Sequence, residues 1–410
     1  MFHPSQSFLV RCCNRLLLRR KHLNTHNTVA FINGNVNNSR REYSSGVDGD
    51  GRPRTSMCAW HVHSYGGDEE LSLSTTARLP IIHGPNDVLV EVHAASVNPV
   101  DVKMRGGYGR DLFKLMRRTT GDLPDFPLTL GRDFSGVVVS VGRSVKHFKT
   151  GDEIWGAIPA HKPGTHAEYV IASESEVSKK PASLLHEEAA ALPYVICTTW
   201  QALCAVGILN PRNIEGQRVL ILGGSGGVGT FAIQLMKAWG AEVTVTCGAD
   251  AVNLVTSLGA DIVIDYKSQS FKQDLKQIDG FDLVYDLFGH DKALAHSLLK
   301  TWRLSKYVTI ETPLIKNVDS LGLPLGITIS AGNFGFSLLK AMSKGQAYGW
   351  GLFRPSSKAL ETVAALIDSA QIIPVVEKVF QFSETPLAYD KVSQGHARGK
   401  TVISMQNESK

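Results

Sequence analysis

The chain has 410 residues, of which 43% are hydrophobic and 20% charged, and this ordinary globular composition suggests two or three domains. Six cysteines are too few for a disulfide scaffold, and no apolar run reaches the roughly 18 residues of a transmembrane helix. The net charge of +5 comes from residues 1–43; acids outnumber bases by one in the rest, which excludes an electrostatic footprint for nucleic acid.

Residues 1–43 form a basic arm with seven Arg or Lys residues and one acid, Glu42. Its segment FLVRCCNRLLLRR places apolar and basic side chains on separate faces of a helix, which is typical of a mitochondrial transit peptide. Arg41 stands two residues before Tyr43 and Ser44 follows, as at a matrix peptidase site, so we predict cleavage after Tyr43. The alternative is a disordered basic tail. A secretory signal is disfavoured because Arg interrupts every apolar stretch.

Short strand-like segments follow from about residue 59 to 179. Apolar and polar residues alternate, and Gly and Pro recur every 8–20 residues, in VLVEVHAASV, GVVVSVG, EIWGAIP and HAEYVIA. These alternating segments and the spacing of the turn residues predict a small β-barrel domain at 57–188. Residues 105–127 keep no sustained period, and we expect a loop there.

Strands and helices alternate after about residue 186. HEEAAALPYVICTTWQALCAVG has helical spacing, and RVLILGG, EVTVTCG, DIVIDY, FDLVYDLFG and KYVTIET read as strands separated by helices. Such alternation predicts a parallel sheet with helices on both faces at 189–345. Residues 346–410 are mixed and end in the strand KTVISM, so we expect the chain to return to its first domain.

A glycine-rich turn carries the strongest chemical signal. Gly224, Gly226 and Gly229 form a GxGxxG after the apolar strand Val219–Leu222 and at the start of the helix Val228–Trp239. In this context the glycines allow a tight turn, close approach of a pyrophosphate and close helix–strand packing. Free N–H groups at the helix start then face the phosphates. The alternative is a glycine turn without a ligand.

The next strand end indicates which nucleotide binds. An NAD site usually has an acid there for the ribose hydroxyls, whereas this chain has Thr246–Ala249, and Asp250 comes late. We therefore favour NADPH over NADH. The turn has no Arg, so Tyr266 and Lys267 are candidate phosphate partners unless they are solvated turn residues.

Several motifs together resemble a known superfamily. They are NPVD at 98–101, GYG at 107–109, LGRDFSGV at 130–137, GDE at 151–153 and GTHAEY at 164–169. With the glycine turn, they resemble the zinc-independent quinone oxidoreductase branch of the medium-chain dehydrogenase/reductase superfamily over about residues 57–405. The resemblance implies an α/β chain with a GroES-like β-barrel domain and a Rossmann doubly wound parallel-sheet domain, and a cofactor and substrate in the cleft between them.

Zinc ligands of the superfamily are replaced in this chain. Zinc-dependent members have a Cys in the segment occupied by Ala95–Asn98 and a His in a Gly-His-Glu motif, which here reads Gly131-Arg132-Asp133. Arg has no lone pair to donate. The four-Cys structural loop, CxxC spacings and HExxH are also missing. We expect no metal, and an electron-poor acceptor that needs no Lewis acid.

The resemblance also implies site residues. Those for the cofactor are Ser225, Gly226, Gly227 and Val228 at the pyrophosphate; Cys247, Gly248 and Tyr266 near the adenosine 2′-phosphate; Asp286, Ile310, Gly351 and Phe353 at the nicotinamide half; and His396, Ala397 and Arg398 closing over it. Arg398 would supply the phosphate-binding charge; an exposed basic loop is the alternative for 396–398. Tyr108 matches the proton-donating Tyr of related enoyl reductases, and Asn98 would orient the substrate. Alternatively, Tyr108 only packs under a lid.

Together these features predict a mitochondrial matrix enzyme that reduces quinone-like acceptors with NADPH. The resemblance implies a place in ubiquinone biosynthesis, with a reticulon or a ubiquinone-pathway protein as a partner. Two alternatives remain: a 2-enoyl-thioester reductase, and an NADPH-binding interaction protein that partners a reticulon and turns over little. A homo-oligomer and a second pool at the outer membrane also stay open.

Overall fold

The computed structural model describes residues 54–121, 125–289 and 291–405. The chain divides into Met1–Arg54 and Thr55–Lys410, and the described residues from Thr55 onward belong to the second unit. The predicted transit peptide and its cleavage after Tyr43 lie outside the described residues.

The predicted β domain is present as two sheets. A three-stranded sheet has the order β2-β1-β4, with bounds Leu71–Arg78, Ser56–Val62 and Leu128–Thr129. A seven-stranded sheet has the order β15-β16-β3-β5-β6-β8, and β7 also pairs with β3. Its strands are β3 (Asp87–Val97), β5 (Asp133–Val141), β6 (Glu153–Ala157), β7 (Tyr169–Ser173), β8 (Val177–Lys179), β15 (Val376–Gln381) and β16 (Lys400–Ser404). All four strand segments predicted for this region are confirmed.

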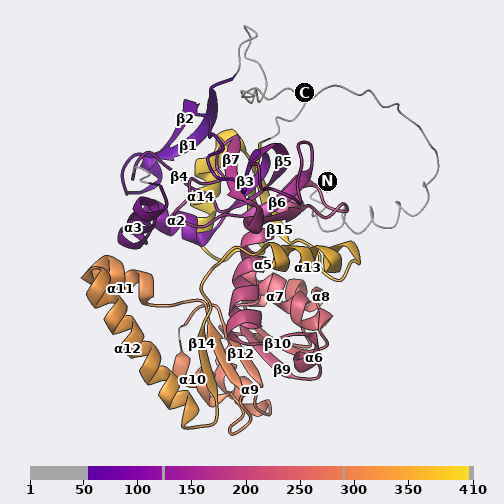
Figure 1. Ribbon diagram of the computed structural model, residues 1–410. Coiled ribbons are helices and arrows are strands. Elements are labelled where there is room, and N and C mark those ends of the chain that lie inside the picture. The colour runs from indigo at the N-terminus through magenta and orange to yellow at the C-terminus, as the bar shows by residue number, and fades with distance from the viewer. Residues whose placement is uncertain (1–53, 122–124, 290, 406–410) are drawn as a thin grey trace, which may run out of the picture. The chain divides into compact units, whose positions relative to one another are not determined.

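The chain end pairs with a strand from the start of the described residues. β16 pairs antiparallel with β3, so that Thr401 stands opposite Val97. The C-terminal segment with α14 (Thr385–Ser393) and β15 accordingly lies among the first strands (Figure 1). This return brings residues 396–400 to the glycine turn.

A third sheet is parallel and has six strands in the order β11-β10-β9-β12-β13-β14. Their bounds are β9 (Arg218–Leu222), β10 (Glu242–Cys247), β11 (Ile262–Asp265), β12 (Leu283–Asp286), β13 (Lys306–Thr309) and β14 (Ala347–Trp350). This is the doubly wound order, and the direction of winding reverses between β9 and β12. A nucleotide binds at the carboxyl ends of the strands beside such a reversal. The predicted fold class is confirmed.

Alternation along β9 explains why helices cover both faces of the sheet. Val219 and Ile221 face a core cluster formed with α5 (Pro193–Thr199), α7 (Gly227–Ala238) and α13 (Ser357–Asp368). Leu220 points to the opposite face and a second cluster. The shorter helices are α4 (His186–Ala190), α6 (Pro211–Ile214), α8 (Val252–Ser257), α9 (Phe271–Gln277) and α10 (Lys292–Ser297).

One helical segment has the length and composition of a membrane span. It runs over His186–Val206, through α4, α5 and the π-helical turn Trp200–Val206, and is the only such segment among the described residues. Most of it is buried inside the protein. It belongs to the core between the seven-stranded sheet and the parallel sheet.

Two regions differ from the sequence predictions. The loop expected at 105–127 is wrong in part, because α2 (Pro99–Arg105) is followed by the helix α3 (Arg110–Gly121). Its apolar residues Leu112, Phe113, Leu115 and Met116 do have helical spacing, but the run is short and lies between glycines and prolines that favour a loop. The hairpin of α11 (Leu314–Leu321) and α12 (Leu323–Met342) was not predicted, because α12 is apolar on nearly all sides. The hairpin lies at one side of the parallel sheet (Figure 1).

Candidate active site

The glycine turn has the geometry that a pyrophosphate requires. A Cβ on Gly224 would collide with Val245, and a Cβ on Gly229 would lie 2.3 Å from the carbonyl oxygen of Gly223, so both must be glycine. A Cβ on Gly226 would instead meet open space. Gly226 is the N-cap of α7 and provides no side chain to accept from the first turn. The helix start is therefore open to an anion.

Residues 396–400 cross directly over this turn. The Gly399 amide donates to the carbonyl oxygen of Ser225 at 3.0 Å, and Gly399 forms a parallel bridge with Gly226. The Lys400 side chain runs past Gly227, where an added Cβ would come within 2.5 Å of its Cδ. Val228 packs partly buried against the main core. The four predicted pyrophosphate residues thus lie together beneath the C-terminal segment.

Arg398 reaches the turn after β10. Its Nη1 donates to Ser225 Oγ at 3.3 Å, and the guanidinium forms an ion pair with Asp250. An added Cβ on Gly248 would lie 3.8 Å both from Arg398 Nη2 and from a ring carbon of Tyr266. The predicted 2′-phosphate residues are therefore together, and Arg398 supplies the cation that this turn lacks in sequence.

Three of the predicted residues contribute through the backbone. The Cys247 side chain is 1% exposed and packs in the core, while its carbonyl accepts from the Tyr266 amide at 3.1 Å. The carbonyls of His396 and Ala397 accept from Arg398 Nη1 at 3.0 and 3.2 Å. They hold the guanidinium in place and are not aimed at a ligand.

A buried polar network lies next to the turn. Lys400 Nζ donates to Asn98 Oδ1 at 2.6 Å and to Asp133 Oδ2 at 3.2 Å. Asn98 Nδ2 donates to the same Asp133 oxygen at 2.8 Å. The Asn98 backbone amide is fixed by Asp101 at 2.8 Å in a capping box that begins α2. Asn98 is thus held rigidly, as an orienting amide must be.

Tyr108 lines a cavity of about 420 Å³. The other residues around it are Lys103, Gly289, Lys292, Glu311, Thr312, Pro313 and Lys316. Burial, together with smaller contributions from the charges of Glu311 and Asp319, raises the pKa of the Tyr108 phenol to about 12. The phenol therefore keeps its proton at neutral pH and can donate it.

The predicted nicotinamide residues occupy strand ends of the parallel sheet. Asp286 ends β12, but its carboxylate is used internally: it accepts from the amides of Phe288 and Gly289 at 3.0 and 2.8 Å and from Tyr307. An added Cβ on Gly351 would lie 3.3 Å from Ile310. Asp286 thus shapes the turn beside the cavity through its side-chain carboxylate.

Sequence reasoning missed two residues of the site. One is Tyr194, on which Phe353 stacks with ring centroids 4.2 Å apart; burial raises the pKa of Tyr194, and the charges of Asp101, Asp133 and Tyr108 add to this. A second phenol therefore lies near the first. Lys400 was missed because it stands 302 residues from Asn98. The one available signal was its position directly after the predicted 396–398 segment.

Comparison with known proteins gives consistent matches. The profile of the alcohol dehydrogenase GroES-like domain matches residues 84–182, and that of the zinc-binding dehydrogenases matches 258–403. The human mitochondrial NAD(P)H oxidoreductase RTN4IP1 is 50% identical over 86% of this chain and 90% of its own length. The mitochondrial reticulon-4-interacting protein 1 of Caenorhabditis elegans is 40% identical, over 85% of this chain and 95% of its own. The quinone oxidoreductase from Coxiella burnetii superposes with a TM-score of 0.69 at 30% identity, covering 85% and 99% of the two chains.

Zinc, which one matching profile implies, does not fit the residues present. Arg132 occupies the position of the expected His ligand and is held by the Asp101 carboxylate and by the Pro159 carbonyl at 2.7 Å. Asn98 Oδ1 already accepts from Lys400. Within residues 54–121, 125–289 and 291–405, no group of three or more His, Cys, Asp or Glu side chains is placed to hold a metal.

Proposed function

Because the chain belongs to the RTN4IP1 family of NAD(P)H oxidoreductases, within the medium-chain dehydrogenases and reductases, we propose that it uses NADPH to reduce quinone-like acceptors in the mitochondrial matrix. The observation that carries the choice of NADPH is Arg398, whose guanidinium stands beside Gly248 and Tyr266. A planar guanidinium matches the oxygens of a phosphate. Asp250 holds Arg398 there and would share it with the 2′-phosphate.

Different residues bind the cofactor, hold the substrate site in place and supply the proton. The nicotinamide cofactor supplies the hydride when it is bound. The N–H groups at the start of α7 bind the pyrophosphate, and the C-terminal segment at 396–400 closes over the turn. Lys400 and Asn98 form a fixed polar floor. Tyr108 holds the proton that a reduced acceptor oxygen needs.

An electron-poor carbonyl acceptor suits these groups. A quinone accepts hydride without a Lewis acid, and zinc does not fit this site. The 420 Å³ cavity at Tyr108 is large enough for a single ring. The Coxiella neighbour, a quinone oxidoreductase, supports the same acceptor class. A benzoquinone intermediate of ubiquinone biosynthesis is our specific proposal.

A 2-enoyl-thioester reductase is the second candidate. Lys103, Lys292 and Lys316 stand around the Tyr108 cavity, and only Lys103 has an acidic neighbour within 4 Å among the described residues, Glu311 at 3.7 Å. Such a cationic rim suits a phosphate-bearing thioester carrier. The name of the worm relative supports a third role, an NADPH-binding protein that partners a reticulon. This role fits a second pool at the outer membrane.

One experiment separates these candidates. The oxidation of NADPH and NADH by the full chain would be followed by absorbance with benzoquinones and with enoyl thioesters. We expect benzoquinone turnover that is faster with NADPH. Turnover with enoyl thioesters alone would show that the acceptor is a thioester and not a quinone. Tight NADPH binding without turnover on either panel would favour the interaction protein, and no nucleotide binding would refute all three.

A further inference from the structure

The last turns of α12 and a neighbouring loop expose large apolar side chains together. Trp302 and Leu304 are each 75% exposed, Phe336 is 72% exposed and Leu339 is 67% exposed, and Met342 continues the surface. We call these five residues the apolar tip. The loop lies beside the end of α12, because the Trp302 and Leu304 amides donate to the carbonyls of Lys344 and Gly345, each at 2.9 Å. Exposed patches of this kind mark interaction sites.

The loop holds its two apolar side chains outward against a conformational cost. Trp302 and Leu304 have φ angles of 57° and 53°, in the left-handed region that large side chains rarely adopt. The two hydrogen bonds to the end of α12 maintain this conformation. Gln346 Nε2 also donates to the Leu299 carbonyl at 3.2 Å, which fixes the start of the loop. Strain of this kind is retained where the display of a residue has a use.

Cations surround the tip, and acids are missing from its two segments. Arg303, Lys340 and Lys344 lie in residues 300–306 and 336–345, which contain no Asp or Glu. None of the three forms an ion pair with the described residues. Burial lowers the pKa of His296, and the charges of Lys344 and Lys340 lower it further. The two cations therefore act on the same part of the surface.

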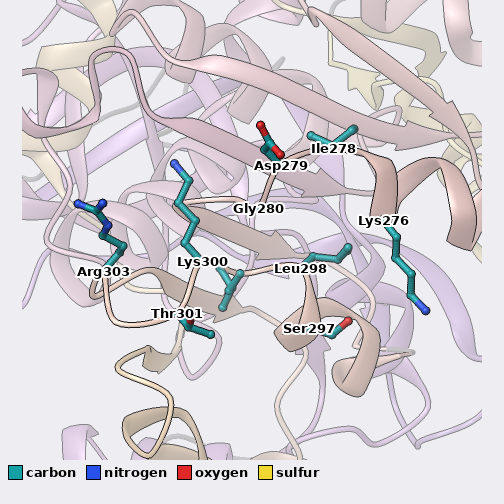
Figure 2. Close-up of a pocket in the computed structure, with 10 residues that line it drawn as sticks. Lys276, Ile278, Asp279, Gly280, Ser297, Leu298, Lys300, Thr301 and Arg303 are labelled. Atoms are coloured by element: carbon teal, nitrogen blue, oxygen red, sulfur yellow. The ribbon is translucent and has the colours of Figure 1, made fainter.

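A basic cavity of about 550 Å³ adjoins the loop. Lys300 and Arg303 line one side of it and Lys276 another, with Asp279 at its edge (Figure 2). Asp282 pairs with Lys300 at 2.7 Å, whereas Arg303 and Lys276 line the cavity without such a partner among the described residues, and their charged ends point away from each other (Figure 2). Its size and charge suit an anionic headgroup beside the apolar tip.

From this arrangement we infer that the apolar tip docks on an anionic phospholipid membrane, with Trp302 at the lipid–water interface and Arg303, Lys340 and Lys344 on the headgroups. Trp favours that interface, and each basic residue near it adds attraction to anionic lipid. A second copy is a poorer occupant, since an isologous contact pairs the patch with itself and would bring the cations of one copy to the cationic surface of the other. The inference is independent of the acceptor that the enzyme reduces.

Vesicle binding tests this inference in the full chain. The bound fraction would be measured by flotation with phosphatidylcholine vesicles and with vesicles of about one-third phosphatidylglycerol. We expect binding to the anionic vesicles only. The double variant Phe336→Ser/Leu339→Ser should weaken it by at least about tenfold, and Lys340→Gln by about fivefold. Ile81→Ser and Leu387→Ser, which alter similarly exposed apolar residues elsewhere, should leave it unchanged.

A local readout excludes binding through the basic N-terminal arm. Brominated lipids in the anionic vesicles should quench fluorescence in the parent, and Trp302→Phe should remove most of that quenching. NADPH binding by each variant checks that it is folded. Anionic-vesicle binding that survives both the Phe336→Ser/Leu339→Ser and Lys340→Gln changes would overturn the inference. The inference would also be overturned if the parent bound no vesicles but formed a dimer that the double variant abolishes. The apolar tip would then be the interface between two copies of the chain.

Discussion

The substitution Gly226→Ala separates nucleotide binding from folding. A Cβ at this position meets open space, and the φ angle of −78° is one that alanine adopts readily. At an N-cap alanine is worse than glycine by roughly 0.5–1 kcal/mol, but it restricts the unfolded chain by a similar amount, so the free energy of unfolding should change by less than about 0.5 kcal/mol. The same methyl group would occupy the space that the pyrophosphate needs.

The expected loss of affinity follows from that displacement. Losing one hydrogen bond to a charged group costs about 1.5–3 kcal/mol, which corresponds to about 10- to 150-fold in Kd. The pyrophosphate is common to both nucleotides, so NADPH and NADH should weaken equally. Calorimetric titration measures the two Kd values, and thermal melting measures stability.

Two control variants define the result. Gly332→Ala also places a methyl group in open space and should bind like the parent, whereas Gly229→Ala, with its 2.3 Å contact, should lower the melting temperature. Unchanged Kd values in a folded Gly226→Ala protein would refute the assignment of the turn to the pyrophosphate.

Three further predictions concern single side chains. Arg398→Gln should raise the Kd of NADPH by about 10- to 100-fold and leave the Kd of NADH unchanged. Asp250→Asn should lower the Kd of NADPH, because it frees the guanidinium. Equal shifts in the two Kd values in titrations would contradict this. Tyr108→Phe should lower kcat by about 100-fold. Because the pKa of the phenol is raised to about 12, the rate of the parent should show no alkaline loss from Tyr108 up to about pH 10. An unchanged kcat in Tyr108→Phe would show that the phenol has no chemical role. Burial lowers the pKa of His166 to about 4, below the 6.5 of the unfolded chain. The unfolded state therefore gains the proton first, and stability should fall as pH drops from 6.5 towards 4. In His166→Gln the melting temperature should depend less on pH over this range; an equally strong dependence would assign the acid sensitivity to other groups.

Local patterns explain which parts of the fold were predictable. The parallel sheet was readable because each strand is a short apolar run followed by a helix, and the glycine turn because three positions exclude a side chain or leave room for a ligand. α12 was not readable, because one side packs on the sheet while Phe336 and Leu339 remain apolar and exposed on the other. A helix with two apolar sides shows no amphipathic period.

The site was predictable only where its residues are close in sequence. Sequence reasoning placed Cys247 at the phosphate, but alternation along β10 points its side chain into the core. Arg398 could be proposed from the resemblance, whereas its contacts with Ser225 and Asp250 depend on how the chain end returns. No spacing rule connects residues that meet through tertiary structure.

Charge balance in the buried network explains how this site is stable where related enzymes have a metal. Asp101 and Asp133 are fully buried, and a buried carboxylate without compensation is costly. Arg132 lies 3.6 Å from Asp101, and Lys400 lies 3.2 Å from Asp133, so two side-chain cations offset two carboxylates. Since Lys400 also passes Gly227 at the cofactor turn and donates to Asn98, the same cation joins the nucleotide-binding turn to the floor of the site. The positive charge at this centre is therefore fixed by the return of the chain end, and a metal would have to displace it.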